Sequence, residues 1–380
     1  MVFSTADWDT AYWTNKQHVA AKLAEMGHRV LYVETPGLRA PSANRKDLAR
    51  LWRRLRAGLR RPAEVRHRVW KLSPLGVPFA HSRPLVRRLN QGLLRWRIAS
   101  FMRHLEFERP IVWTYHPYML QTLAGMRRGK LVYHCVDDLA AIPGVDAESF
   151  NREEERLLRQ ADVVFTTSSV LAEKCRRVSR HVHELPNVAD FEHFARAHEG
   201  GSPPADMAAI PGPRIVYMGV LSAYKVDFAL LAEAAALRPQ WSWVLIGDER
   251  EGQDSPLLKR LLALGNVHAL GYRPYAQLPE YLKGADVGLI PALVNEYTRS
   301  MFPMKYFEYL AAGVPVVATA LEFTRDRPDC VVAHDAKELV ALAERCLAAG
   351  RLSKERSSEL VGENTWEART RSMLALLEYA

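Results

Sequence analysis

The chain has 380 residues, of which 48% are hydrophobic and 25% charged, values typical of a soluble globular protein with more than one domain. It contains no run of about 18 apolar residues and no basic N-terminal region followed by an apolar segment, so we expect neither a membrane span nor a signal peptide. The four cysteines lack the spacing of a disulfide framework or a zinc site, which favours a cytoplasmic location.

The net charge of +9 is concentrated in one segment. Residues 39–103 contain 18 Lys or Arg and only two acidic residues, a local charge of +16, which leaves −7 for the rest of the chain. This asymmetry predicts an anionic partner of one of three kinds: nucleic acid, an acidic lipid surface or a phosphorylated substrate.

The first half of the chain alternates strands and helices. An apolar strand precedes a helix over residues 15–27, which Thr14 is expected to cap, and a strand over residues 28–34. Further strands are expected at residues 110–116, 130–138, 162–169 and 181–187, with helical segments between them. Such alternation predicts a parallel sheet with helices on both faces.

Within the basic segment, "DLARLWRRLRAGLRR" predicts an amphipathic helix. Its leucines and Trp52 follow helical spacing, while most of its arginines fall on the opposite side. The pattern is typical of a helix lying on anionic lipid, with a membrane surface formed by Trp52, Arg53, Arg54, Arg60 and Arg61. A helix packed on its own domain with solvated arginines explains the pattern equally well.

The second half repeats the architecture of the first. Residues 199–213, "EGGSPPADMAAIPGP", are rich in Gly and Pro and predict a linker. Alternating strands and helices then begin at residue 214 and continue to residue 321. We therefore expect an α/β fold of two Rossmann-like doubly wound domains, 1–198 and 214–362, with a terminal helix over 363–380 that packs towards the first domain.

One lysine occupies an unfavourable position. "MKYFEYLAAGVPVVAT" predicts a helix that ends at Gly313 and leads into a strand, with Lys305 in the first helical turn. The helix dipole there favours anions, so an anion bound from outside would explain the lysine, and a solvated surface lysine is the alternative. Glu308 lies on the same helix face. A nucleotide explains both residues, because Lys305 would neutralise a diphosphate and Glu308 would accept hydrogen bonds from ribose hydroxyls.

Glycines begin three loops of the second domain that follow predicted strands: Gly219, Gly247 and Gly271. In open parallel sheets ligands bind beyond the carboxyl ends of the strands, and a glycine there lets a ligand approach the backbone closely. Together these loops and the helix that begins near Lys305 predict a ligand site at this edge.

These segments resemble glycosyltransferases of the GT-B fold, particularly bacterial exopolysaccharide enzymes related to glycosyltransferase family 4. "FEYLAAGVPVVAT" is similar to the nucleotide-binding signature of that family, "GYRPYAQLPEYLKGADVGLIP" to the segment before it, and "LPNVADFEHF" to the end of the N-terminal domain. The resemblance implies a nucleotide-sugar site formed by Gly219, Ser222, Lys225, Tyr272, Arg273, Tyr297, Met304, Lys305 and Glu308.

The sequence departs from family 4 at two positions. A second glutamate usual in the family is Ser300 here, and an arginine that often follows the first glycine is Val220. Both departures favour inverting over retaining chemistry. The pattern is similar to xanthan glucuronosyltransferase, an inverting enzyme that shares the Met304–Lys305 pair and an aspartate after a strand like "LVYHCVD".

That aspartate is Asp137, in "YHCVDDL". Asp137 and Asp138 follow an apolar strand, and neighbouring carboxylates can raise one pKa, which suits a general base. We expect Asp137 to take the proton from the acceptor hydroxyl and Asp138 to lie on the acceptor or sugar side. Helix capping is the alternative for either aspartate. His116, at the end of another strand, is expected to contact acceptor or donor sugar, although a structural hydrogen-bonding role is equally common.

The pair of aspartates in "DWD" resembles the metal-binding motif of other glycosyltransferases. It lies in the first strand-to-helix loop, so we place Asp9 on the acceptor side and expect no metal and no cofactor, since Lys305 and the helix dipole can stabilise the leaving diphosphate.

The sequence thus predicts a cytoplasmic glycosyltransferase at the inner face of the cell membrane. It would move a sugar from a UDP- or GDP-sugar to a lipid-linked oligosaccharide or polysaccharide acceptor, with an anionic membrane surface as partner and no nucleic acid. Two alternatives stay open. One is a nucleotide-sugar epimerase on the same fold, and the other is a nucleic-acid-binding protein that uses residues 39–103.

Overall fold

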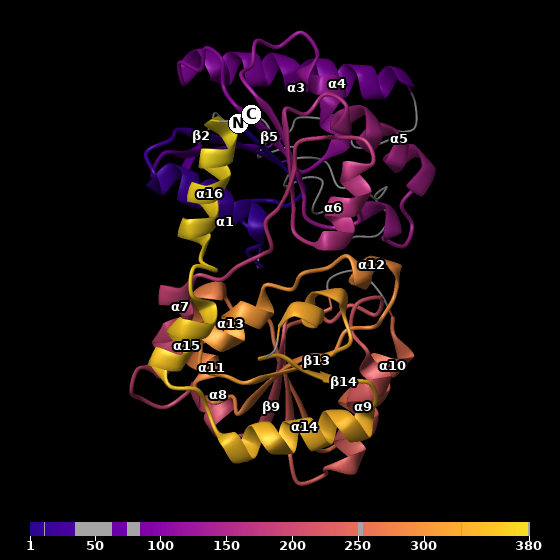
Figure 1. Ribbon diagram of the computed structural model, residues 1–380, viewed down its shortest axis with the longest axis vertical. Helices are drawn as coiled ribbons and strands as arrows, with labels where there is room; N and C mark the ends of the chain where they lie inside the picture. Colours follow the sequence, from indigo (N-terminus) through magenta and orange to yellow (C-terminus); the bar gives the residue numbers. More distant parts are fainter. Residues whose placement is uncertain (11, 35–62, 74–83, 250–253, 328, 379–380) are drawn as a thin grey trace. The chain divides into compact units, whose positions relative to one another are not determined.

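A computed structural model describes residues 1–10, 12–34, 63–73, 84–249, 254–327 and 329–378. The chain forms two compact units (Figure 1). Unit 1 comprises Met1–Leu185 together with Thr370–Ala380, and unit 2 comprises Pro186–Arg369. Each unit contains its own sheet, so the predicted pair of α/β domains is confirmed.

The described part of unit 1 contains an eight-stranded sheet in the order β3-β4-β2-β1-β5-β6-β7-β8. All its neighbouring strands are parallel except the β3–β4 pair. The strands are β1 (Val2–Ser4), β2 (Val30–Glu34), β3 (Ala63–Arg66), β4 (Val69–Leu72), β5 (Val112–Thr114), β6 (Leu131–Cys135), β7 (Val163–Thr166) and β8 (Val182–Glu184). The central strands are buried along their whole length, as parallel strands covered on both faces must be.

The helices of unit 1 connect these strands. They are α1 (Asn15–Glu25), α3 (Pro84–His104), α4 (Leu120–Leu123), α5 (Ala147–Leu158) and α6 (Ser169–Arg176). Helix α1 begins as predicted, because Thr14 and Gln17 form a capping box in which the Thr14 N–H donates to Gln17 Oε1 at 3.1 Å. The capping box fixes the first turn of α1 at the carboxyl end of β1.

Unit 2 is built on a six-stranded parallel sheet in the order β11-β10-β9-β12-β13-β14 among the described residues. The strands are β9 (Arg214–Met218), β10 (Ser242–Ile246), β11 (Val267–Gly271), β12 (Val287–Ile290), β13 (Val316–Thr319) and β14 (Val331–Ala333). Because all run in one direction, the loops that follow β9, β10, β11 and β12 lie at the same edge of the sheet.

Two apolar cores cover the two faces of this sheet. The helices are α7 (Phe191–Ala195), α8 (Ala205–Ala208), α9 (Phe228–Leu237), α10 (Pro256–Leu262), α11 (Leu278–Leu282), α12 (Glu296–Arg299), α13 (Lys305–Ala311), α14 (Ala336–Ala349) and α15 (Lys354–Val361). Figure 1 shows α9 and α14 on one face and α13 and α15 on the other. The sheet is therefore doubly wound, as predicted.

Helix α13 packs unusually closely on the sheet. A Cβ atom at Gly288 of β12 would lie 2.7 Å from the ring of Tyr309, so only glycine leaves room for this aromatic side chain. The Tyr309 hydroxyl accepts the Met218 N–H at 2.8 Å and donates to the Val216 carbonyl at 3.2 Å. These bonds fasten α13 to β9 and place its first residue, Lys305, at the carboxyl edge of the sheet.

The structure divides the chain earlier than the sequence analysis did, at Leu185 instead of residue 198. Residues 199–213, which we expected to form a linker, contribute Met207 and Ile210 to the core of unit 2. The segment also contains α8, a short helix that its Gly and Pro content did not predict. Burial of its two apolar residues depends on packing that composition does not reveal.

Helix α16 (Trp366–Glu378) spans the boundary between the two units, because Thr370 and the residues after it belong to unit 1. Within unit 1, Lys130 Nζ donates a hydrogen bond to the Leu377 carbonyl near the end of the helix. Over the ranges described, no helix combines the length and apolar character that crossing a membrane requires.

Candidate functional site

The contact between Lys305 and Gly219 is the centre of the site in unit 2. Gly219 follows β9 with φ +146°, and a Cβ atom there would lie 2.7 Å from Lys305 Nζ. The Lys305 ammonium also lies 5.7 Å from the centre of the Tyr217 ring. Two residues that the sequence analysis assigned to one nucleotide site, 86 positions apart in the chain, are thus brought into direct proximity.

A second lysine strengthens the positive charge at this edge. Lys225, in the loop after β9, places its ammonium 4.8 Å from the Tyr224 ring centre and 5.3 Å from that of Tyr297. Lys225 lies near enough to disfavour the charged form of Lys305. Two neighbouring ammonium groups repel each other, and an anion bound beside them would relieve that repulsion.

Glu308 lies one turn after Lys305 on α13, and its side chain is buried. Burial raises the pKa of Glu308 to about 7, while the nearby Lys305 ammonium opposes this rise. Burial also lowers the pKa of Lys305, an effect that Glu308 opposes and Lys225 reinforces. In the described part of the chain Lys305 forms no ion pair within 4.0 Å, and Glu308 is the opposite charge that acts on it.

The remaining donor-side residues surround this cluster. Ser222 is fully buried in the turn after Gly219, where its carbonyl accepts the Lys225 and Val226 N–H groups at 3.1 and 2.9 Å. Tyr297 is buried in α12, edge-on to Tyr224 at 5.5 Å. Met304 directly precedes the first residue of α13. Their sequence-based assignments stay predictions, and their positions are compatible with them.

Ser300 occupies the position at which the family resemblance implied a glutamate. Its side chain is buried, and its hydroxyl donates to the Tyr297 carbonyl at 2.9 Å. The residue therefore offers a short neutral group where a carboxylate was expected from the family.

Tyr272 and Arg273 follow β11 at the same edge, but Arg273 has strong partners of its own. Its guanidinium donates to the Tyr281 hydroxyl and to Asp206 of α8, each at 2.5 Å. The hydrogen bond from Arg273 holds the pKa of Asp206 below its ordinary value. Arg273 thus fastens α8 to this loop, a role that the sequence analysis did not foresee, and its predicted place on the base side stays a prediction.

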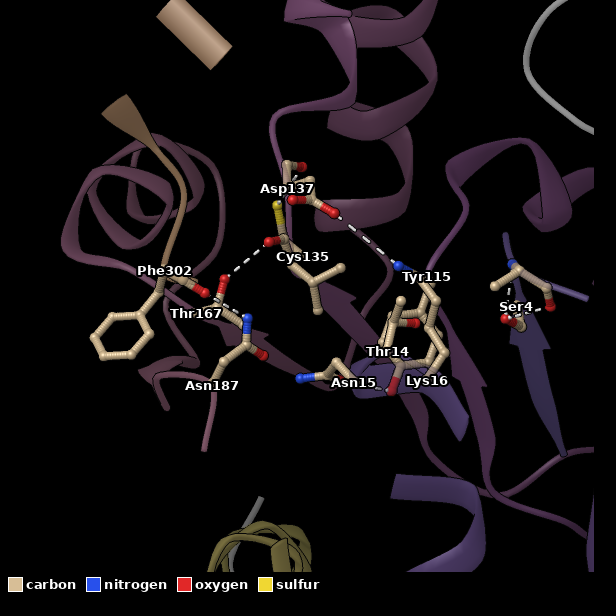
Figure 2. Close-up of polar contacts among 12 residues, drawn as sticks. Ser4, Thr14, Asn15, Lys16, Tyr115, Cys135, Asp137, Thr167, Asn187 and Phe302 are labelled. Atoms are coloured by element: carbon tan, nitrogen blue, oxygen red, sulfur yellow. Dashed lines mark hydrogen bonds and ion pairs between the residues drawn. The ribbon is translucent and has the colours of Figure 1, made fainter. Parts of the chain in front are cut away.

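In unit 1, Asp137 follows β6 at the carboxyl edge of its sheet, where its carboxylate faces Lys16 of α1 (Figure 2). Asp137 Oδ2 lies 4.0 Å from Lys16 Nζ, with 26% and 10% of the two side chains exposed. The Lys16 ammonium lies 5.7 Å from the ring centre of Tyr115, whose hydroxyl donates to Asn15 Oδ1 at 2.9 Å. The first turn of α1 therefore holds a cation against the predicted base.

Asp138 points to a different lysine. Its Oδ1 lies 2.9 Å from Lys174 Nζ, which also lies 2.8 Å from the buried Glu154. Glu154 in turn accepts the Tyr133 hydroxyl at 2.6 Å. The helical turn that follows Asp138 receives no hydrogen bond from its side chain, so the capping alternative is wrong for Asp138. Asp138 belongs to a partly buried network that supports the loop carrying Asp137.

His116 is held by the backbone. It is 4% exposed, and its Nδ1 accepts the Tyr118 N–H at 3.2 Å. Burial lowers the pKa of His116 to about 4, so the imidazole is neutral at physiological pH. The structure thus shows the structural hydrogen-bonding role that the sequence left open, and sugar contact stays a prediction.

Asp9 forms an ion pair with Lys71 of β4, and 70% of the aspartate side chain is exposed. The predicted membrane-surface residues, Trp52, Arg53, Arg54, Arg60 and Arg61, lie outside the described residues.

Sequence reasoning missed Lys16 and Tyr217. Lys16 could have been found by the argument used for Lys305, because it too is a cation in the first turn of a helix that follows a strand. No comparable pattern marks Tyr217. Its proximity to Lys305 depends on how α13 packs against β9.

Comparison with known proteins finds a family match within unit 2. Residues 212–349 match the family described as Glycosyl transferases group 1. This range contains all the donor-side residues that the sequence analysis named, and the match confirms the resemblance on which those assignments rest.

One curated relative supports this result. The chain is 29% identical over 209 residues to a Bacillus subtilis (strain 168) protein named as the teichuronic acid biosynthesis glycosyltransferase TuaH. The aligned part covers 51% of this chain and 51% of that protein, so the chain spans about half the length of the curated relative it matches.

Solved structures share the fold over the whole chain. A sucrose-phosphate synthase from Thermosynechococcus elongatus has a TM-score of 0.74 at 17% identity, covering 100% of this chain and 98% of that one. HepE from Anabaena, in complex with UDP-glucose, has a TM-score of 0.70 at 14% identity, with coverages of 100% and 99%. At these identities the likeness establishes the fold.

Proposed function

We propose that this chain, which has the GT-B fold and carries a glycosyl transferase group 1 domain, transfers a sugar from a nucleoside-diphosphate sugar to an acceptor hydroxyl in cell-surface polysaccharide synthesis. The acceptor would be a lipid-linked oligosaccharide or a polysaccharide. The proposal for the pathway class is supported by TuaH, which is named for teichuronic acid biosynthesis.

The observation that carries the proposal is the close approach of Lys305 to Gly219 beside Lys225. Two ammonium groups at the carboxyl edge of a parallel sheet suit a diphosphate, and the missing side chain at Gly219 lets that diphosphate reach the backbone. The solved structure of HepE with UDP-glucose supports a nucleotide sugar as the donor class.

The proposed reaction is a single displacement. The acceptor hydroxyl attacks the anomeric carbon, Asp137 takes the hydroxyl proton, and the bond from that carbon to the diphosphate oxygen breaks with both electrons on the leaving group. Lys305 and Lys225 stabilise the charge that develops on the diphosphate. Such a displacement inverts the anomeric centre, in keeping with a serine at position 300, and the likeness to xanthan glucuronosyltransferase stays a hypothesis.

Calorimetric titration with UDP, GDP and ADP tests the donor site. We expect one diphosphate to bind selectively and the Lys305→Ala variant to bind it more weakly. Lys259→Ala is the matched control, because Lys259 lies in the same unit, is exposed and pairs with Asp254. Failure of all three diphosphates to bind would refute the proposed donor.

We also propose that unit 1 binds an anionic membrane surface, through α3. Its side chains Leu89 and Trp96 are 60% and 64% exposed, and their spacing of seven places them on one helix face. From Pro84 to His104 the helix contains five arginines and no acidic residue. Exposed apolar side chains on one face of an arginine-rich helix are typical of a helix at a lipid interface.

Vesicle sedimentation tests this surface. Wild-type protein should bind vesicles with phosphatidylglycerol more strongly than neutral ones, and Leu89→Ser with Trp96→Ser should abolish the difference. Leu257→Ser is the control, because Leu257 is a comparably exposed leucine in unit 2. Equal binding by the variant and the wild type would contradict a role for α3.

A further inference from the structure

Among the described residues of unit 2, two arginines lack the carboxylate partners that their neighbours have. Arg325 pairs with Glu322 at 3.0 Å, and Arg356 pairs with Asp329 and Glu359. In contrast, Arg327 and Arg369 form no ion pair in the part of the chain that the structure describes. The following contacts place both guanidinium groups around one short segment of unit 2.

Arg369 lies in α16, and its guanidinium is only partly hydrogen-bonded. Its buried Nε atom has no hydrogen-bond partner among the described residues, and the bond from its Nη2 to Asn364 Oδ1 is long, at 3.5 Å. Burial lowers the pKa of Arg369 to about 10, and the charge of Arg327 acts in the same direction. Buried donors without partners are rare in folded proteins and call for a specific explanation, such as a ligand.

Arg327 is held against an aromatic pair. Its guanidinium carbon lies 5.5 Å from the Phe302 ring centre and 5.4 Å from that of Phe307. Cation–π contact orients the guanidinium without consuming its N–H donors. Phe302 precedes α13 and Phe307 lies within it, so Arg327 packs against the helix that carries Lys305 and Glu308.

The segment from Asn187 to Ala189 connects the surroundings of the two arginines. Asn187 Nδ2 donates to the Phe302 carbonyl at 2.8 Å (Figure 2), and the Ala189 N–H donates to the Asn364 carbonyl at 3.2 Å. Phe302 contacts Arg327, and Asn364 contacts Arg369. The pair therefore belongs to one local cluster, which shares no residue with the Lys225–Lys305 cluster.

Two like charges that are partly buried together destabilise a protein unless an anion joins them. Guanidinium groups bind carboxylate and phosphate oxygens through paired N–H donors, and they do so most strongly where water is excluded. We propose that Arg327 and Arg369 bind an oxyanion, a carboxylate or a phosphate group, carried by the donor sugar or by the acceptor. The identity of the molecule that carries the oxyanion rests on the proposed function, whereas the existence of the anion site does not.

Calorimetric titration with inorganic phosphate tests the site. The Lys305→Ala variant serves as background, so that the predicted diphosphate site contributes little. We expect saturable binding that Arg327→Gln or Arg369→Gln weakens about tenfold or more. Arg325→Gln is the matched control and should leave the affinity unchanged, since Arg325 is exposed and already paired. Absence of saturable binding, or equal affinity in all variants, would overturn the proposal.

Replacing phosphate by glucuronate distinguishes the two kinds of oxyanion. Tighter binding of glucuronate would assign the site to a carboxylate-bearing sugar, and tighter binding of phosphate to a phosphorylated substrate. In either case Arg327→Gln and Arg369→Gln should weaken binding of the preferred anion. These titrations contain no UDP. Failure of the wild-type protein to bind UDP in a separate experiment would therefore refute the proposed donor and leave the test of the oxyanion site unaffected.

Thermal unfolding provides a second readout that does not depend on the calorimetry. Phosphate should raise the unfolding midpoint of the Lys305→Ala protein, and Arg369→Met in the same background should remove that rise. Without phosphate, Arg369→Met should itself raise the midpoint, because it removes an unpaired charge from a partly buried position. A phosphate response that persists in the Arg369→Met protein would contradict the assignment.

Discussion

The carboxyl edges of the two sheets carry opposite charge patterns. In unit 1 the predicted base, Asp137, faces Lys16, and Asp138 faces Lys174, so each carboxylate has a cation from the same chain. In unit 2 Lys305 lies against Gly219 and near Lys225, with the buried Glu308 as its nearby opposite charge. At the first edge both aspartates are paired with lysines, whereas at the second edge the neighbouring ammonium groups would be stabilised by a bound anion.

This difference indicates separate tasks for two similar domains. Matched charges hold a carboxylate in one orientation, which a proton-transferring group requires. Neighbouring ammonium groups repel each other in the free protein, and a bound diphosphate removes this repulsion. The site is therefore preorganised for an anion before the ligand binds. The same fold therefore supports a positioned base in one unit and an anion receptor in the other.

The largest expected effect concerns the edge of unit 1. Asp137→Asn should lower the turnover number about 10²- to 10⁴-fold, the usual contribution of a general base, while UDP binding is unchanged. Steady-state transfer kinetics and UDP calorimetry measure the two quantities. Asp138→Asn is the control, because Asp138 supports the loop and should affect stability more than turnover. Near-normal turnover in a folded Asp137→Asn protein would refute the assignment of the base.

The second prediction concerns the buried carboxyl of unit 2. The pKa of Glu308 is about 7 in the folded protein and near 4.5 in the unfolded chain, so the folded state binds more protons between these values. Stability should therefore fall as the pH rises from about 4.5 to about 7, by up to about 3 kcal/mol from this residue, and change little above that range.

Urea unfolding at several pH values, with wild type and Glu308→Gln compared, measures this contribution. The neutral glutamine lacks the titrating proton, so the difference in unfolding free energy between the two proteins should change with pH in that window. A difference that is constant across the window would show that Glu308 titrates normally.

The third prediction tests the anion-receptive edge directly. Lys305→Ala should weaken UDP binding about 10- to 100-fold, because a charge-assisted contact to the diphosphate is worth about 1.5–3 kcal/mol. Binding should also lose part of its dependence on ionic strength, because the variant removes one of the charges that attract the diphosphate. An unchanged affinity for UDP in calorimetry would show that Lys305 does not contact the diphosphate.

The smallest effect is expected from Gly219→Ala. The added Cβ would lie 2.4 Å from Lys305 Cε, whose flexible side chain can move, but a φ of +146° also strains any residue with a Cβ, so the loss of stability should be about 1–2 kcal/mol. UDP affinity should fall as well, since Lys305 is displaced. Gly265→Ala is the control, because no atom lies within 4 Å of a Cβ at that position. Chemical denaturation measures the unfolding free energy of both variants. A loss of stability in Gly219→Ala alone would show that it comes from the surroundings of Gly219, whereas equal losses would contradict this.

Local sequence patterns predicted most of the architecture. Alternating apolar strands and amphipathic helices predicted two parallel sheets, and Thr14 and Gly313 marked helix ends that the structure contains. The unfavourable position of Lys305 predicted an anion site because helix polarity depends only on neighbouring residues. The resemblance to family 4 supplied the roles of the donor-side residues, which no local pattern specifies.

Several features depend on contacts between residues far apart in the chain. The pairing of Lys16 with Asp137, the use of Arg273 to hold Asp206, and the burial of Met207 and Ile210 all arise when separate elements pack together. The same holds for Arg327 and Arg369, which form no ion pair among the described residues, a feature that only the packing of separate elements reveals.

The sequence by itself thus determined the fold class, the limits of many elements and the edge of unit 2 at which an anion is expected, since these follow from periodicity, capping and helix polarity. The tertiary structure decided which charges are paired, which are buried together and where the domain boundary falls. Those properties depend on distances across the fold, and a linear pattern of residues does not contain them.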